Sequence, residues 1–266
     1  MAAAVVVVAP IAIHAQVPLG QAAASYDVVS VKPNKSGPNG MSWGSTADGY
    51  RATNVSLGML IQSAWNLKTE DLIYGLPKWD HDARFDVEGK MDADAVATLK
   101  QLPPKEARVQ RDLMMQNMLI ERFHLQIHHD IKQLPVYNLN VAKGGLKVKE
   151  ADPANAYPEV KMGSSRVAGA GSMMFGPGQF TGNAVTLAAL ADNLSGTLSR
   201  LVIDKTGLTG KYDFALKYAP DDAPTTNDPG PSLFTALEEQ LGLHLESTKG
   251  PVDTIVIDHL EQPTEN

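Results

Sequence analysis

Two stretches of this chain, residues 49–141 and residues 179–257, share an ordered series of short motifs. The first copy contains Tyr50-Arg51-Ala52-Thr53-Asn54-Val55-Ser56-Leu57, and the second contains Phe180-Thr181-Gly182-Asn183-Ala184-Val185-Thr186-Leu187. Further on, Phe123-His124-Leu125 corresponds to Leu243-His244-Leu245. A repeated supersecondary unit is typical of two copies that pack against each other. We therefore expect two similar units with a cleft or a shared core between them.

Each copy mixes short alternating strands with amphipathic helices. Ser56 and Thr186 are good N-caps, and each is followed by leucines at helical spacing. Residues 106–122 predict a longer helix with a broad apolar face. Residues 123–132 and 136–141 predict a hairpin, and residues 243–246 and 254–259 predict the closing strands. The pattern predicts an α+β fold of two tandem β-α-β-β-α-β-β-like repeats, with helices on one face of antiparallel sheets.

The predicted boundaries follow the change in composition along the chain. Residues 1–24 contain an apolar run at 5–13 that ends in small residues, which is typical of a secretory signal peptide. Residues 25–145 form the first repeat, residues 146–178 a Gly-, Ala- and Ser-rich linker, and residues 179–266 the second repeat. We therefore expect a periplasmic or secreted protein. The run at 5–13 is too short to span a bilayer, so we expect no transmembrane segment.

Charge and cysteine content exclude several classes of function. The net charge of the 266-residue chain is −7, and no cluster of Lys and Arg is present to displace counterions. We therefore expect neither nucleic acid nor an anionic membrane as partner. The chain has no cysteine, which excludes disulfides, thiol catalysis and zinc–thiolate sites.

A histidine pair is the first candidate for catalysis. His128 and His129 lie in a predicted strand and are followed by Asp130. Residues two apart in a strand share a face, so His124 and His128 should point one way and His129 the other. Histidine can activate water as a general base, and a carboxylate can assist it. The alternative is that these are surface or interface histidines.

A group of carboxylates is the candidate for metal binding. Asp80 and Asp82 flank His81, and Asp86 follows closely. Calcium prefers several oxygen ligands, and alternating Asp residues in a turn can supply them. These three residues are therefore the predicted Ca²⁺ ligands. Asp86 and Asp213 also occupy matching places in the two copies, where each could instead hydrogen-bond a neighbouring turn.

Two further patterns leave alternatives open. Gly40-Met41-Ser42-Trp43-Gly44 matches the G-x-S-x-G pattern of serine hydrolases, but loop-forming residues follow it where that pattern needs a helix. A chance match in a loop over residues 36–49 is the other explanation. Met114, Met115 and Met118 could line a groove for an acyl chain or fill the core.

Longer motifs carry a resemblance to a known family. They include Gly75-Leu76-Pro77-Lys78-Trp79, Arg84-Phe85-Asp86 and Leu134-Pro135-Val136-Tyr137, together with residues 142–145, 202–214, 232–243 and 257–266. In these motifs the chain resembles the soil-associated protein family that is abundant in acidobacteria. The Gly-Leu-Pro-Lys-Trp turn departs slightly from the form of the family. Most members of this family have no assigned activity.

The resemblance implies one activity and leaves room for another. It implies calcium-dependent hydrolysis of N-acyl-homoserine lactones, a quorum-quenching reaction, with a small acyl lactone as substrate. The repeat unit also resembles the short N-terminal domains of secretins and TonB-dependent receptors, which bind partners without catalysis. The sequence therefore predicts an N-acyl-homoserine lactonase, and the alternative is a non-catalytic periplasmic binding module.

Overall fold

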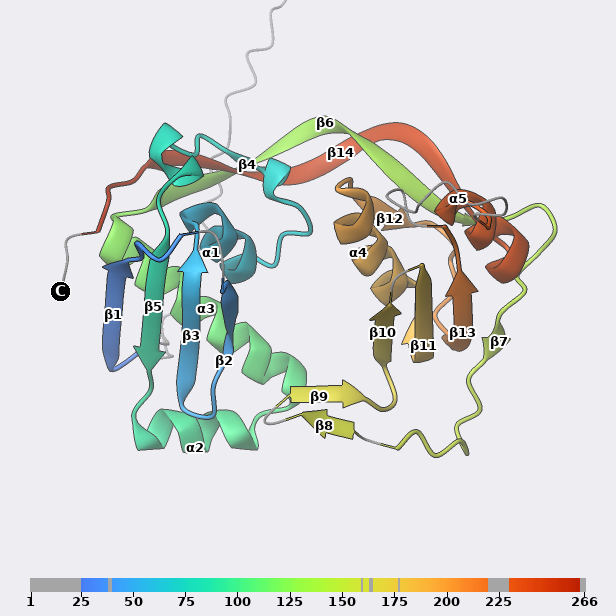
Figure 1. The fold of residues 1–266 in the computed structure, drawn as a ribbon, viewed down its shortest axis with the longest axis horizontal. Coiled ribbons are helices and arrows are strands. Elements are labelled where there is room, and N and C mark those ends of the chain that lie inside the picture. The colour runs from blue at the N-terminus through green and yellow to red at the C-terminus, as the bar shows by residue number, and fades with distance from the viewer. Residues whose placement is uncertain are drawn as a thin grey trace, which may run out of the picture.

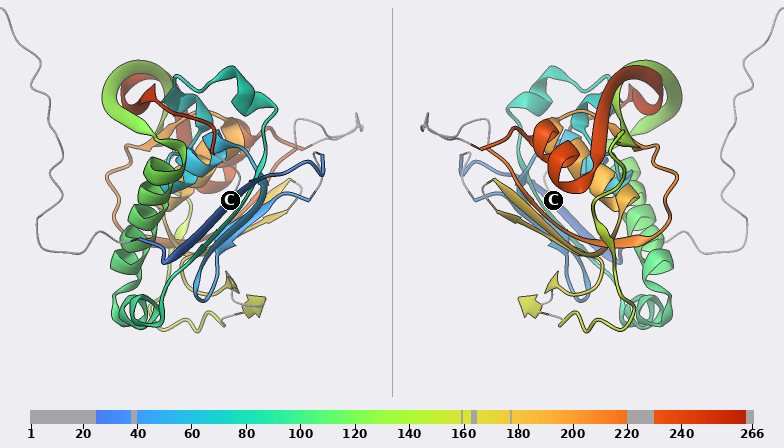
Figure 2. Two further views of the ribbon diagram at one scale, coloured as in Figure 1. Left: turned by 90° about the vertical axis from the view of Figure 1, so that its left-hand side faces the viewer. Right: turned by 90° about the vertical axis from the view of Figure 1, so that its right-hand side faces the viewer.

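The structure is a computed structural model that describes residues 25–37, 40–158, 160–162, 165–176, 178–219 and 230–263. The signal peptide predicted at residues 1–24 lies outside these residues. Two lobes lie side by side, and one long antiparallel ribbon runs across both of them (Figure 1). The fold is α+β, as predicted, and helices cover one face of the sheet in each lobe (Figure 2).

The first lobe contains a four-stranded antiparallel sheet. Its strands lie in the order β1, β5, β3, β2, so β1 and β2 are its edges. The strands are β1 (Val28–Pro33), β2 (Ser42–Ser45), β3 (Gly49–Val55) and β5 (Phe85–Lys90), and the helices are α1 (Leu57–Ala64), α2 (Ala93–Gln101) and α3 (Pro104–Phe123). Two 3₁₀ turns, η1 (Glu70–Leu72) and η2 (Lys78–His81), lie between α1 and β5.

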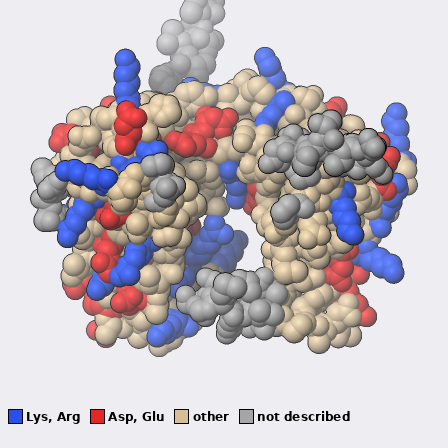
Figure 3. All heavy atoms as spheres, in the orientation of Figure 1, with Lys and Arg blue, Asp and Glu red and all other residues tan. Residues whose placement is uncertain are grey.

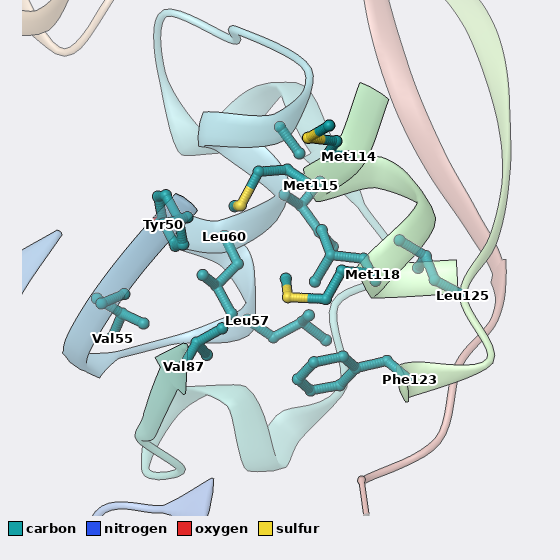
Figure 4. Packing of buried hydrophobic residues seen from close by; sticks show 14 of the residues in the cluster. Tyr50, Val55, Leu57, Leu60, Val87, Met114, Met115, Met118, Phe123 and Leu125 are labelled. Atoms are coloured by element: carbon teal, nitrogen blue, oxygen red, sulfur yellow. The ribbon is translucent and has the colours of Figure 1, made fainter. Parts of the chain in front are cut away.

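Apolar side chains from α1, α3 and the sheet form the core of the first lobe. Leu57 and Leu60 of α1 point towards α3 and the sheet (Figure 4). Met114, Met115 and Met118 of α3 join them and are 2–5% exposed. These three methionines therefore fill the core, where an unbranched thioether adapts to irregular gaps, and they do not line a groove.

The second lobe contains a second four-stranded antiparallel sheet, in the order β10, β11, β13, β7. Its strands are β7 (Lys149–Glu150), β10 (Ser172–Gly176), β11 (Gln179–Thr186) and β13 (Lys211–Lys217). Helix α4 (Leu187–Leu198) follows β11, and α5 (Leu233–Ala236) continues directly into a π-helical turn, η3 (Leu237–Leu241). Two further strands, β8 (Val160–Met162) and β9 (Ser165–Ala168), pair with each other.

The segment predicted as a linker is thus partly strand. Within residues 146–178, β7 and β10 form the two edges of the second sheet, and β8 and β9 form a separate pair. Such short strands form because a neighbouring strand offers its backbone groups, and not because their own sequences alternate. Composition alone therefore did not reveal them.

The two lobes use the same device where a strand passes into a helix. In β3 and β11 the pairing slips at a bulge, and Asn54 and Ala184 adopt positive φ angles of 59° and 50°. The backbone N–H of this residue donates to a carboxylate. Asn54 donates to Asp86 at 3.0 Å in the first lobe, and Ala184 donates to Asp213 at 2.8 Å in the second. The hydrogen bond expected from the matching positions of the two aspartates is present in both lobes.

The next residues begin the helix in the same way in each lobe. The hydroxyl of Ser56 accepts the N–H of Met59, and the hydroxyl of Thr186 accepts the N–H of Ala189. Each of these bonds satisfies one of the free N–H groups at the start of its helix. The N-caps predicted at Ser56 and Thr186 are therefore confirmed.

The ribbon that joins the lobes consists of β6 (Gln126–Val141) and β14 (Leu243–His259). The sequence predicted a hairpin at residues 123–141 and two closing strands after residue 243, and this prediction was wrong. Each region forms one continuous strand, because β6 and β14 pair with each other along almost their whole length. Pro135 stays within β6 opposite Lys249. Two short strands, β12 (Val202–Asp204) and β4 (Ile73–Tyr74), add in parallel at the ribbon's edges, so this third sheet is mixed.

The ribbon contributes side chains to both cores. Ile255 of β14 is fully buried in the first core, and Leu243 and Leu245 of the same strand pack in the second. Between them, a small cluster of Leu72, Val136 and Val252 packs against residues of both lobes. A salt bridge of 2.9 Å from Lys68 to Asp192 of α4 also spans the lobes. The lobes are therefore held together by buried apolar area as well as by the ribbon.

Candidate functional site

The histidines predicted to be catalytic lie on opposite faces of β6, as expected for neighbouring residues of a strand. Nδ1 of His128 is 2.8 Å from a carboxylate oxygen of Asp258, and Nδ1 of His129 is 3.0 Å from one of Asp253. Both histidines are exposed. His124 was expected in the same strand, but it ends helix α3 in a left-handed conformation with φ 48°. The structure thus forms two separate His–Asp pairs on the ribbon.

Asp130 has a different partner from the one predicted. Its carboxylate accepts a hydrogen bond of 2.7 Å from the ammonium of Lys132, and this bond lowers the pKa of Asp130 below its usual range. The carboxylates beside the two histidines come instead from the end of the chain. No local spacing could have identified them, because 130 positions separate His128 from Asp258.

Asp80 lies buried at the start of helix α1. Its Oδ1 accepts the backbone N–H groups of Leu57 at 2.7 Å and Gly58 at 3.2 Å. Burial raises the pKa of Asp80, and the two backbone hydrogen bonds act in the opposite direction. The side chain thus satisfies two N–H groups that the helix leaves free.

The other two carboxylates of the predicted calcium site have separate environments. Oδ1 of Asp86 accepts the side-chain N–H of Asn34 at 2.7 Å as well as the backbone of Asn54. Asp82 is exposed at the end of the turn η2. Within the part of the chain that the structure describes, no three His, Asp or Glu side chains are arranged to hold a metal ion. Calcium binding by Asp80, Asp82 and Asp86 stays a prediction.

Ser42 begins strand β2, in the segment that was predicted as a loop. A hairpin joins β2 to β3, with the N–H of Thr46 donating to the carbonyl of Gly49 at 2.9 Å. The nucleophilic serine of the G-x-S-x-G pattern needs a strand that turns sharply into a helix. The surroundings of Ser42 therefore favour the chance match.

A cavity of about 440 Å³ opens in the second lobe, where the loop after β6 meets η3 and β14. Nδ1 of His244 is 3.3 Å from a carboxylate oxygen of Glu238. Lys147 donates to the carbonyl of Glu239 at 2.8 Å and lines the same cavity. Phe234 and Leu245 supply apolar lining. An imidazole, a carboxylate and an ammonium thus meet in one cavity.

Sequence reasoning missed this cavity. His244 was recognised only as the counterpart of His124 in the repeat, and Glu238 only as part of the motif at residues 232–243. The turn that carries Glu238 and Glu239 is π-helical, a geometry that occurs often at functional sites. The helical spacing of the neighbouring leucines gave no sign of it.

An opening lies between the two lobes, below the ribbon. Figure 3 shows the surface hollowed here, with Lys and Arg side chains at the back of the hollow. The sheet edges β2 and β10 border it from opposite sides (Figure 1). Among the described residues, β2 pairs only with β3, and β10 only with β11. Two unpaired sheet edges therefore flank one opening.

Each of these edges carries a half-exposed aromatic residue. Trp43 of β2 is 52% exposed, and it pairs across the strands with Ala52, which is buried below the helices. Phe175 of β10 is 51% exposed, and it pairs with the buried Phe180, whose ring is 4.9 Å away in an edge-to-face contact. Cross-strand partners share a face. Trp43 and Phe175 therefore lie on the helix-covered face of their sheets, at the unpaired edge.

Fold and surface together define a class: a two-lobed α+β protein whose sheets are joined by a shared antiparallel ribbon. The chain belongs to the family described as "Protein of unknown function (DUF3738)", whose model matches residues 58–260. Comparison with curated proteins and with solved structures gave no match. Over the described residues, no helix has both the length and the apolar character needed to cross a membrane.

Proposed function

We propose that this protein is a binding module that holds an extended polypeptide segment in the opening between its lobes. The observation that supports this proposal is the pair of unpaired sheet edges, β2 and β10, each with a half-exposed aromatic residue. An unpaired edge offers backbone N–H and C=O groups to an incoming strand, and neighbouring pockets select its side chains. Trp43 and Phe175 would supply the apolar contacts.

A synthetic peptide tests the proposal. A fluorescein-labelled dodecapeptide that repeats Thr-Phe-Thr-Gln is neutral and favours an extended conformation. Fluorescence anisotropy should show saturable binding, and the same peptide with N-methylated backbone amides should not bind. Trp43→Ala and Phe175→Ala should each weaken binding by about tenfold, because burial of an aromatic side chain contributes roughly 1.5–3 kcal/mol.

A matched control is Phe234→Ala, which removes a partly exposed aromatic residue from the 440 Å³ cavity instead of the opening. Its affinity for the peptide should equal that of the wild type. Equal binding of the methylated and unmethylated peptides, or no binding of either up to millimolar protein, would contradict the proposal.

A second candidate function is hydrolysis of N-acyl-homoserine lactones, and the cavity around His244 favours it. His244 could take a proton from water as the water attacks the lactone carbonyl, while Glu238 orients the imidazole. The ring C–O bond would then break, and the leaving oxygen would accept the proton, which gives the open N-acyl-homoserine. Lys147 lines the same cavity, and in this proposal its ammonium would stabilise the negative charge on the carbonyl oxygen.

Chromatography of the ring-opened product distinguishes this site from the one predicted by sequence. If the cavity is the active site, His244→Ala should abolish turnover. If the active site lies on the ribbon, His128→Ala, His129→Ala or Asp130→Ala should abolish turnover instead. Calcium binding at Asp80, Asp82 and Asp86 would appear as loss of turnover in EGTA and recovery with added calcium. Absence of turnover in the wild type, with calcium present, would rule out the lactonase.

A further inference from the structure

The edge of β2 has a definite pattern of free backbone groups. The N–H of Thr46 donates to Gly49, so this pair is hydrogen-bonded. Hydrogen-bonded and non-bonded pairs alternate along antiparallel strands. The pair of Gly44 with Arg51 is then hydrogen-bonded, whereas Trp43 and Ser45 point their N–H and C=O groups away from β3. Four backbone groups are therefore available at this edge for an added strand.

A cavity of about 230 Å³ lies beside the same edge. It is lined by Trp43, by Met59, Gln62 and Ser63 of α1, by Asn66 and Leu67, and by Arg108 of α3. Trp43 and Met59 give it an apolar wall. A strand that pairs with Trp43 and Ser45 would place alternate side chains on this helix-covered face, above the cavity.

The lining of this cavity includes a charged side chain. Among its described lining residues, Arg108 is the one that carries a charge. Its side chain is 64% exposed, and it donates to Oδ1 of Asn66 at 2.5 Å, which fixes the guanidinium at the rim. Asp112, one turn further along α3, forms an ion pair with Arg108, but its carboxylate oxygen is 3.8 Å from Nε, too far for a hydrogen bond. The guanidinium thus keeps donors for a carboxylate from outside.

From these three features we infer that the edge of β2 takes a strand that carries an apolar residue and an acidic residue on the same face. The apolar side chain enters the cavity between Trp43 and Met59, and the carboxylate pairs with Arg108. The two residues stand an even number of positions apart in the partner, because side chains alternate between the faces of a strand. This inference rests on the proposed function and specifies its partner.

Three dodecapeptides of equal length test the inference: repeats of Thr-Phe-Thr-Glu, Thr-Phe-Thr-Gln and Thr-Phe-Thr-Lys. Anisotropy is measured near 150 mM salt, where the Debye length of about 8 Å screens the net charge of the protein. The acidic peptide should bind about tenfold more tightly than the neutral one, and the basic peptide most weakly. The acidic preference should vanish in Arg108→Gln, which should bind the acidic and the neutral peptide with equal affinity.

Arg51→Gln is the matched control. Arg51 lies in the same sheet but next to Ala52, so it points to the opposite face, where it pairs with Glu88 at 2.7 Å. This variant should keep the acidic preference, and Arg108→Lys, which keeps the charge, should keep part of it. Equal affinity of wild type for the acidic and neutral peptides would overturn the inference but leave the binding module standing. Failure of all three peptides to bind would overturn both.

Discussion

Asp80 shows how a buried carboxylate can serve the fold. Its Oδ1 accepts two backbone N–H groups at the start of α1, and burial raises its pKa. Asp80→Ala leaves both donors unpaired in a buried place, so it should lower the free energy of unfolding by about 1–3 kcal/mol. Asp80→Asn keeps an oxygen acceptor and should fold with stability close to that of the wild type at pH 7. Urea unfolding measures both, and equal stability of Asp80→Ala and the wild type would contradict this role.

The carboxylate of Asp80 also makes the free energy of unfolding depend on pH, and the raised pKa gives the direction of that dependence. Because its pKa is higher in the folded state than in the unfolded state, the folded state holds the proton more tightly. The free energy of unfolding of the wild type, relative to Asp80→Asn, should therefore fall as pH rises from about 3 to 7. Urea unfolding of the two proteins at several pH values gives this difference. A difference that rises with pH would show that the backbone hydrogen bonds outweigh the burial.

The sequence correctly predicted features that depend only on residues close together in the chain. Ser56 and Thr186 were correctly predicted as N-caps, because a cap needs only the residues that follow it. The partners of His128 and His129 could not be predicted, because β14 brings Asp258 and Asp253 to them from the end of the chain.

At the scale of elements, the ribbon of β6 and β14 differs most from what the sequence predicted. The hairpin predicted at residues 123–132 and 136–141 would turn at residues 133–135, yet β6 continues through them opposite β14, although Pro135 has no N–H to donate. The cavity at His244 depends in turn on the π-helical turn η3, which places Glu238 beside β14. Strand pairing over such separations, and one irregular helical turn, are set by packing that a single sequence does not display.

The ribbon's contribution to the first core gives a prediction for β14. Ile255 is fully buried among residues of the first lobe, although it stands near the end of the chain. Ile255→Ala should lower the free energy of unfolding by about 2–5 kcal/mol, because it leaves a cavity in a packed core. Ile131→Ala is the control, since Ile131 lies in the same ribbon and is 63% exposed. Thermal unfolding should show a large loss for the first variant and almost none for the second.

At the scale of the whole molecule, the shared ribbon should make the lobes unfold together. The three tryptophans, Trp43, Trp65 and Trp79, all lie in the first half of the chain, so their fluorescence reports on the first lobe. Leu190→Ala alters a fully buried residue of α4 in the second lobe, at a cost of about 2–5 kcal/mol. The tryptophan transition in urea should shift with it and coincide with the circular dichroism transition. An unshifted tryptophan transition would show that the lobes unfold independently.

Hydrogen exchange at the edge of β2 tests strand addition most directly. In the free protein, the backbone N–H groups of Trp43 and Ser45 point away from β3, so NMR should show fast exchange there and slower exchange at Gly44. With saturating Thr-Phe-Thr-Glu dodecapeptide, exchange at Trp43 and Ser45 should slow markedly, whereas exchange at Gly44 should change little. Peptide binding that leaves the exchange of Trp43 and Ser45 unchanged would contradict the pairing of a partner strand with this edge.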